Sequence, residues 1–155
     1  MIDSRTFRKL SRPTQIHLQV GGCMLHLMRK VDDARGSLTV GEAPTQLPFA
    51  PQRYFIVFNV PSDSLRGAHA HRLCQQFLVC VRGSCQILLD DGKQRCELTL
   101  DTPDVGVFVP ELIWGTQHQY SSDAALMVLA SRTYEPEDYI HTYDEFVAER
   151  AKLDY

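Results

Sequence analysis

Short stretches that alternate apolar and polar residues, or that are almost continuously apolar as at 76–81, recur along most of the chain, and these are the patterns of half-buried and buried β-strands. These stretches cover residues 16–20, 23–28, 37–40, 52–60, 76–81, 85–89, 95–100, 105–109, 113–120 and 124–130. Turn sequences such as Gly21-Gly22 and Asp90-Asp91-Gly92 separate them. About ten short strands, with turn signals at roughly 8–12-residue spacing, predict an all-β sandwich or barrel.

The pattern changes after residue 130. Residues 135–138 are acidic with an early proline, as at many helix N-termini. Apolar and aromatic residues then recur at the spacing of one helix face: Tyr139, Ile140, Tyr143, Phe146 and Val147. We therefore expect a C-terminal helix over residues 135–150, with its aromatic stripe packed on the β-domain.

Composition and charge narrow the class of protein. A chain of 155 residues with 44% hydrophobic and 23% charged residues is typical of one soluble domain, which we place over residues 1–155 with a polar leader at 1–13. The formal net charge of −3 argues against general binding to nucleic acid or anionic membranes. The sequence lacks a long apolar run, a signal-peptide core and any Cys-x-x-Cys pair among its five cysteines. We expect a cytoplasmic protein with reduced thiols.

The main candidates for catalytic or metal-binding residues lie in the segment Arg66-Gly67-Ala68-His69-Ala70-His71. In a strand, residues two apart point to the same face, so His69 and His71 are expected to share one space, with Arg66 near its rim. Histidine is both the commonest metal ligand and the side chain that titrates nearest neutral pH. The pair therefore either holds a metal or moves a proton.

The spacing of this segment resembles the first motif of metal-binding cupins, but the ligand set is incomplete. Gln76 stands where those proteins carry a glutamate, and an amide is a poorer ligand for a divalent metal than a carboxylate. In the second motif, Gly115 occupies the usual histidine position, which leaves His118 as the one plausible third ligand. Two histidines alone would hold a divalent ion weakly, so the sequence favours proton transfer without a metal or other cofactor.

Several longer blocks resemble the sugar-nucleotide cupins, above all the dTDP-4-keto-6-deoxyglucose 3,4-ketoisomerases, which are related to the dTDP-4-dehydrorhamnose 3,5-epimerases. The blocks are the segment 66–71, Val79-Cys80-Val81-Arg82-Gly83-Ser84-Cys85, Leu89-Asp90-Asp91-Gly92, Leu126-Met127-Val128-Leu129-Ala130-Ser131 and Asp138-Tyr139-Ile140. The resemblance implies a cupin-type double-stranded β-helix, or jelly roll, with a short C-terminal helix. It also implies a homodimer, with an N-terminal strand exchanged between the subunits.

For function, the resemblance implies a metal-independent isomerase of a dTDP-linked keto sugar, in the biosynthesis of an unusual deoxysugar such as those of lipopolysaccharide O-antigens. Moving a carbonyl from C4 to C3 removes a C3 proton, passes through an enediol(ate) and returns a proton at C4. His69 and His71 are the expected catalytic pair, with His69 favoured as base because Arg66-Gly67-Ala68-His69 matches the Arg-Gly-x-His motif of the epimerases. Expected substrate contacts are Arg66, Arg53, Gln76, Arg82, Trp114, Tyr120 and His118.

Three other functions stay open at this stage: a 3- or 3,5-epimerase of the same fold, a metal-dependent cupin enzyme, and a sugar-nucleotide-binding module without catalysis. One departure from the family concerns the strand that begins at Arg53, where the ketoisomerases carry an active-site tyrosine. The only tyrosine of this strand is Tyr54, which alternation is expected to aim away from the site. Either the register of this strand differs from that of the family, or another residue does the work of that tyrosine.

Overall fold

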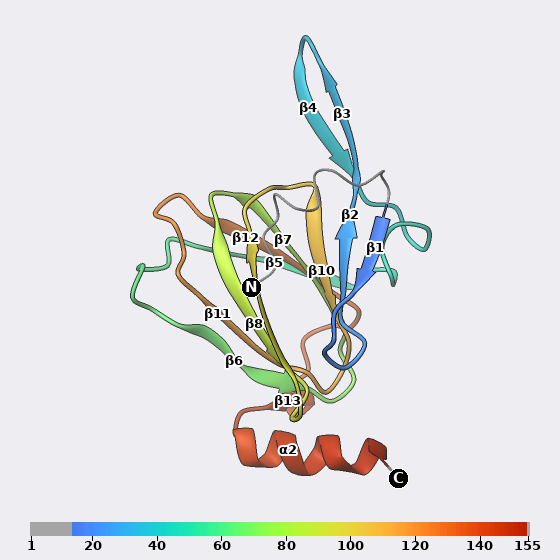
Figure 1. The fold of residues 1–155 in the computed structure, drawn as a ribbon, viewed down its shortest axis with the longest axis vertical. Coiled ribbons are helices and arrows are strands. Elements are labelled where there is room, and N and C mark those ends of the chain that lie inside the picture. The colour runs from blue at the N-terminus through green and yellow to red at the C-terminus, as the bar shows by residue number, and fades with distance from the viewer. Residues whose placement is uncertain (1–13, 155) are drawn as a thin grey trace.

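The computed structural model describes residues 14–154, which form two facing β-sheets and a short C-terminal helix (Figure 1). The larger sheet contains, in spatial order, β1 (Thr14–His17), β2 (Met24–Leu27), β10 (Val105–Val109), β7 (Gln76–Arg82), β12 (Ala125–Ala130) and β5 (Arg53–Phe58). The smaller sheet contains β13 (Tyr139–Ile140), β6 (Arg66–His71), β11 (Trp114–His118), β8 (Cys85–Asp90) and β9 (Arg95–Leu100). All pairings are antiparallel.

The main core lies between the two sheets. Alternate residues of the strands fill it, including Leu78 and Val128 from the larger sheet and Ile87, Leu89 and Leu98 from the smaller. Each of these side chains is at most 3% exposed, which accounts for the alternating pattern of the sequence. The two sheets and their order confirm the predicted jelly roll.

A two-stranded ribbon, β3 (Arg29–Asp33) and β4 (Gly36–Val40), projects from the body of the molecule (Figure 1). The sequence predicts only the second of these strands, because β3 is mostly polar and carries no hydrophobic alternation. Seven of the ten residues of the ribbon strands are exposed and none is buried. The ribbon therefore gains little from burial within its own subunit.

The prediction of one helix over residues 135–150 is wrong in its first half. Residues Pro136–Asp138 form a 3₁₀ turn, and Tyr139–Ile140 form β13, which pairs with β6. The α-helix, α2, spans only Tyr143–Ala151 and begins after Thr142, whose hydroxyl caps the backbone N–H of Glu145. A final 3₁₀ turn covers Lys152–Asp154. For Tyr139 and Ile140, pairing with β6 is favoured over helix formation because the Ile140 side chain is then completely buried.

Two further predictions can be compared with the structure. All five cysteines are free, and four of them are buried, as expected for reduced thiols. Within residues 14–154 no helix combines the length and the apolar character needed to span a bilayer. The leader at 1–13 lies outside the described residues.

Candidate active site

Strand β6 places both histidines on the same side, as the sequence predicts. The His69 and His71 rings lie 5.0 Å apart, nearly perpendicular to each other. The backbone before them is bulged: Gly67 and Ala68 have positive φ angles of 76° and 53°, and the register with β11 shifts at this point. A side chain at Gly67 would lie 2.8 Å from the carbonyl oxygen of Gly115, so glycine is required for the close approach of the two strands.

The histidines lie where a narrow interior pocket opens into a wider groove. The interior pocket, about 20 Å³, is lined by both histidines, Cys74 and apolar core residues. The groove, about 370 Å³, is lined by Phe55, Val57, Leu65, Arg66, Gly67, His69, Gln76 and Gln117. Four residues, Gly67, His69, Gln76 and Gln117, line both spaces. A ligand in the groove would therefore lie directly against His69, with His71 behind it in the interior pocket.

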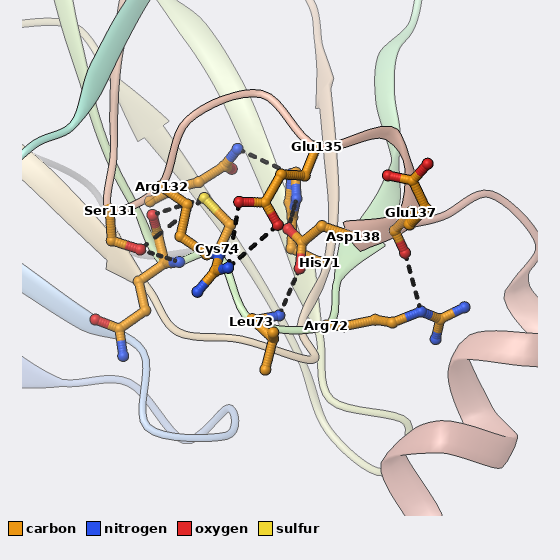
Figure 2. Close-up of polar contacts among 11 residues, drawn as sticks. His71, Arg72, Leu73, Cys74, Ser131, Arg132, Glu135, Glu137 and Asp138 are labelled. Carbon is orange, nitrogen blue, oxygen red and sulfur yellow. Dashed lines mark hydrogen bonds and ion pairs between the residues drawn. The ribbon is translucent and has the colours of Figure 1, made fainter.

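A buried carboxylate fixes the orientation of His71 (Figure 2). The Asp138 carboxylate lies 2.8 Å from His71 Nδ1, and its second oxygen accepts a 2.7 Å hydrogen bond from the backbone N–H of Leu73. On the other side of the ring, the Gln76 side-chain amide lies 3.1 Å from His71 Nε2. The carboxylate accepts the Nδ1 proton, so the neutral ring carries its lone pair on Nε2, where the Gln76 amide donates. That nitrogen is the one equipped to accept a proton.

Burial keeps both histidines in their neutral form. Removal from water lowers the pKa of His71, although its hydrogen bond to Asp138 raises it in part, and protonation of the neighbouring His69 would lower it further. Burial also lowers the pKa of His69 below its usual 6.5. Both imidazoles are therefore unprotonated at neutral pH, as a general base must be.

Tyr139, in β13, closes one side of the pair. Its ring centroid lies 5.1 Å from that of His69 and 4.4 Å from that of His71. Tyr134 and His141 pack in turn against Tyr139. The Tyr139 ring is therefore packed between the two histidines and the rings of Tyr134 and His141. Because Tyr139 is held in this way, it restricts the movement of the two imidazoles on its side.

Two arginines of the predicted site lie near the histidines. Arg66 lines the groove and is exposed. The Arg53 guanidinium lies over the rings of Phe55 and Tyr134, at 5.4 and 5.5 Å, and its positive charge contributes to lowering the pKa of His71. Arg53 Nε is buried without a hydrogen-bond partner. A buried donor without a partner is costly, and an anionic ligand would satisfy it.

The structure does not bring four other predicted residues to the groove. The Arg82 side chain is 75% exposed and lies 3.6 Å from Asp123, at the opposite end of β7 from Gln76. The remaining three face other parts of the molecule. Trp114 packs against Tyr143 and Phe146 of α2, His118 bonds to Glu97 at 2.9 Å, and Tyr120 is a core residue whose hydroxyl donates to Gln117.

These placements have a common cause. Strand β11 alternates, so Gln117 lines the groove while His118 faces Glu97 on the outside of the sheet. Trp114 is needed to cover α2, whose Phe146 is completely buried. Tyr120 contributes only indirectly, because its hydroxyl orients the Gln117 amide.

The family tyrosine expected on β5 is absent from the groove. Tyr54 is 68% exposed and points away, as alternation predicts, while Phe55 and Val57 line the groove. The inward position on this strand therefore carries an aromatic ring without a hydroxyl. Tyr139, from β13, is a tyrosine in contact with both histidines.

The metal arrangement of the cupins does not fit these residues. Gln76 is hydrogen-bonded to His71 Nε2, and His118 is bonded to Glu97 on the outer face of the sheet. His118 is thus not available as a third ligand beside His69 and His71. The residues that would complete the motif are replaced by an amide and by Gly115.

Asp138 is the functional residue that the sequence pattern did not identify. Its acidic, proline-containing context predicts a helix N-terminus, which hides its role. The one available signal is its position in the block Asp138-Tyr139-Ile140 that is shared with the sugar-nucleotide cupins. Only the pairing of β13 with β6 places its carboxylate beside His71.

Comparison with known proteins identifies the family of the chain. A family model described as "FdtA: WxcM-like, C-terminal" matches residues 21–151. The chain is 43% identical, over 81% of its length and 90% of the relative, to a TDP-4-oxo-6-deoxy-alpha-D-glucose-3,4-oxoisomerase of Aneurinibacillus thermoaerophilus. Two solved structures are similar over most of both chains. QdtA, a sugar 3,4-ketoisomerase of Thermoanaerobacterium thermosaccharolyticum in complex with TDP, has a TM-score of 0.83 at 31% identity, covering 86% of this chain and 97% of that one. WlaRB, a TDP-quinovose 3,4-ketoisomerase of Campylobacter jejuni, has a TM-score of 0.80 at 36% identity, covering 83% and 99%.

Proposed function

The chain belongs to the FdtA, WxcM-like C-terminal family, and we propose that it is a TDP-sugar 3,4-ketoisomerase acting on a TDP-4-keto-6-deoxyglucose. The names of the relatives above support this substrate class. The observation that carries the proposal is the Asp138–His71–Gln76 chain beside His69, at the inner end of the groove. A base and a second proton carrier on one face of a sugar are the groups that this reaction requires.

The reaction needs no electron acceptor, because the electrons stay within the sugar. A base takes the C3 proton, and the electron pair of that C–H bond forms the C3–C4 double bond of an enediol(ate). The C4 carbonyl oxygen takes up a proton and becomes a hydroxyl. A second proton is then delivered to C4 while the C3 hydroxyl loses its proton and becomes the new carbonyl. The number of protons taken and returned is equal, so two neighbouring imidazoles are sufficient in principle.

We assign the base to His71 and the shuttle to His69. The Arg66-Gly67-Ala68-His69 motif favours His69 as base, but the contacts support the other choice. Only His71 has a carboxylate on Nδ1, which fixes the tautomer and stabilises the imidazolium that forms when Nε2 accepts a proton. His69 lines the open groove and lies close enough to exchange protons with both solvent and substrate.

The groove has the chemistry to hold a nucleoside diphosphate. We propose that Arg66, which lines the groove, contacts the diphosphate, since a guanidinium binds phosphate oxygens through paired hydrogen bonds. Arg53 is not a lining residue, and its buried Nε would reach the diphosphate only after a movement of its side chain. Gln76 and Gln117 offer amides to the sugar hydroxyls, and Phe55 and Val57 provide an apolar floor. The two positive charges of Arg53 and Arg66 match the two negative charges of such a diphosphate, and a local pair of this kind is compatible with the overall charge of −3.

NMR of TDP-4-keto-6-deoxyglucose in heavy water, with chelator-treated protein, tests the function directly. We expect conversion to a 3-keto product with one deuterium at C4. An epimerase would instead introduce deuterium at C3 or C5 and keep the 4-keto group. Tight TDP binding without exchange at any carbon would refute catalysis and leave only a binding module.

Replacing Arg66 with glutamine is expected to weaken TDP binding about tenfold, because one charge-assisted hydrogen bond is lost. Arg82→Gln is the matched control, since Arg82 is also an exposed arginine but lies outside the groove. Titration calorimetry with TDP measures both. Equal losses in the two variants would show that TDP does not occupy the groove.

We propose that the protein is a homodimer in which a second copy covers the outer side of β5. Three outward side chains of this edge strand, Tyr54, Ile56 and Phe58, are 68%, 45% and 61% exposed. Exposed apolar side chains on an edge strand favour association with another chain. The projecting β3–β4 ribbon, which is little buried in its own subunit, offers a second surface for contact with the partner. The exchange of an N-terminal strand stays a prediction, because β1 pairs with its own β2 and residues 1–13 lie outside the described part.

Replacing Ile56 with lysine is expected to convert the dimer to a monomer, because an ammonium group would be buried in an apolar contact. Val147→Lys is the matched control, since it adds the same charge at an exposed apolar residue of α2, away from β5 and the ribbon. Sedimentation equilibrium measures the mass of both. A variant Ile56→Lys that stays dimeric would exclude the β5 edge as the interface.

The remaining parts of the proposal concern setting and product. The five free cysteines are compatible with a reducing compartment, and we propose a cytoplasmic location. A 3-keto sugar carries the carbonyl that an aminotransferase requires, so we propose that the product feeds the biosynthesis of a 3-amino or other unusual deoxysugar.

A further inference from the structure

We propose that His71, Cys74 and Asp138 form a binding site for one thiophilic divalent cation such as Zn²⁺, and that the bound ion inhibits the enzyme by occupying His71. This donor set differs from the cupin motif, since it uses neither His69 nor His118. The three side chains are buried, and one ligand atom from each lies within 4.8 Å of the others. Figure 2 shows them converging from β6, the loop that follows it, and the turn before β13.

The distance between His71 and Asp138 requires only a small adjustment. Zn²⁺ binds nitrogen and carboxylate oxygen at about 2.0–2.2 Å, so two such ligands in a tetrahedral site lie roughly 3.3 Å apart. His71 Nδ1 and Asp138 Oδ2 are already 2.8 Å apart. An ion could therefore replace the proton between them if the contact opened by about half an ångström. The Cys74 sulfur would complete three protein ligands.

The site also offers room and charge balance. Cys74 and His71 both line the interior pocket of about 20 Å³, which is enough for one water molecule as the fourth ligand. A thiolate and a carboxylate neutralise the two charges of the ion, so no net charge is buried. The backbone N–H of Leu73 already holds the second Asp138 oxygen, which provides the outer support that metal ligands need.

Metal binding and catalysis exclude each other because they need different states of His71. The ion takes the Nδ1 lone pair, so the remaining imidazole proton must move to Nε2. Cys74 releases its thiol proton to the buffer, and no oxidant or reductant is involved. With Nε2 protonated, His71 has no lone pair for the substrate. Binding itself does not rest on the proposed function, whereas the inhibition does.

The test uses the full chain with Co²⁺ and Zn²⁺ as probes. We expect one Co²⁺ per chain, with a thiolate-to-cobalt charge-transfer band, and one proton released per Zn²⁺ in calorimetry with two buffers. Cys74→Ser is expected to weaken Zn²⁺ binding at least as much as the roughly 10–100-fold known for losing a supporting group of a metal site. Cys96→Ser, a half-buried thiol elsewhere in the fold, is the matched control.

Turnover separates the two parts of the proposal. Wild-type and Cys96→Ser proteins are expected to lose turnover as Zn²⁺ saturates the site, while Cys74→Ser keeps its basal turnover in the same Zn²⁺ concentration. Cys74→Ala serves if the serine variant does not fold. Absence of the charge-transfer band, or equal Zn²⁺ affinity in the two cysteine variants, would overturn the site. A saturated site with full turnover would overturn the inhibition.

Discussion

Replacing His71 with asparagine is expected to lower kcat by about 10³-fold and to abolish the uptake of solvent deuterium into the sugar. Asparagine is close in size but cannot accept the C3 proton. Both effects follow from one cause, because the step that moves the carbonyl and the step that exchanges the proton share the same base. NMR in heavy water, with enzyme at high concentration, measures turnover and exchange in one experiment.

The variant His69→Asn provides the contrast. If His71 is the base and His69 the shuttle, His69→Asn still allows C3 proton removal, so slow loss of the C3 proton is expected without matching product formation. Thermal unfolding of both variants is needed as a control, since His71→Asn leaves a buried Asp138 oxygen without its partner, at a cost of about 1–3 kcal/mol. Full exchange in His71→Asn and none in His69→Asn would reverse the two assignments.

Replacing Asp138 with asparagine is expected to lower kcat by about 10²-fold or more while the substrate KM changes little. Asp138 touches no substrate atom in the proposal and acts through His71 alone. Its carboxylate selects the tautomer with the lone pair on Nε2, and an asparagine amide oriented with its NH₂ toward the ring would select the other tautomer. A purely structural loss would instead lower the amount of folded enzyme without changing the pH profile.

The pH profile gives the decisive readout. The base must be unprotonated, so activity is full above the pKa of His71 in the folded enzyme and falls as pH drops through it. Burial sets this pKa below 6.5, and the hydrogen bond to Asp138 raises it. Removing that bond therefore moves the acid limb of kcat/KM to still lower pH. Glu137→Gln, which changes the exposed neighbouring carboxylate, is expected to leave both kcat and the profile unchanged.

The sequence was sufficient for most of the fold because strand formation leaves a local signature. Alternation of apolar and polar residues marks the positions that face the core, and the turns carry their own glycine and aspartate signals. The same rule placed His69 and His71 on one face and aimed Tyr54 outward, since both statements depend only on the period of a strand.

Local signals failed where two elements compete for the same residues. The segment 135–140 has the charge pattern of a helix N-terminus, yet β13 forms because Tyr139 and Ile140 find partners in His71 and Ala70, some 70 positions earlier in the chain. No local preference contains that information. The Asp138 carboxylate reaches His71 only as a consequence of this pairing.

Tertiary structure also decided which side of a strand belongs to the site. Residues such as Trp114 and His118 have suitable chemistry and lie on β11, which flanks the groove, but they face α2 and Glu97. The sequence thus determined the strands, the family and the histidine pair, since each is written in local order. Contacts between distant segments decided that the Asp138 carboxylate lies beside His71 and which residues line the groove. These contacts form only when the two sheets and the C-terminal strand come together.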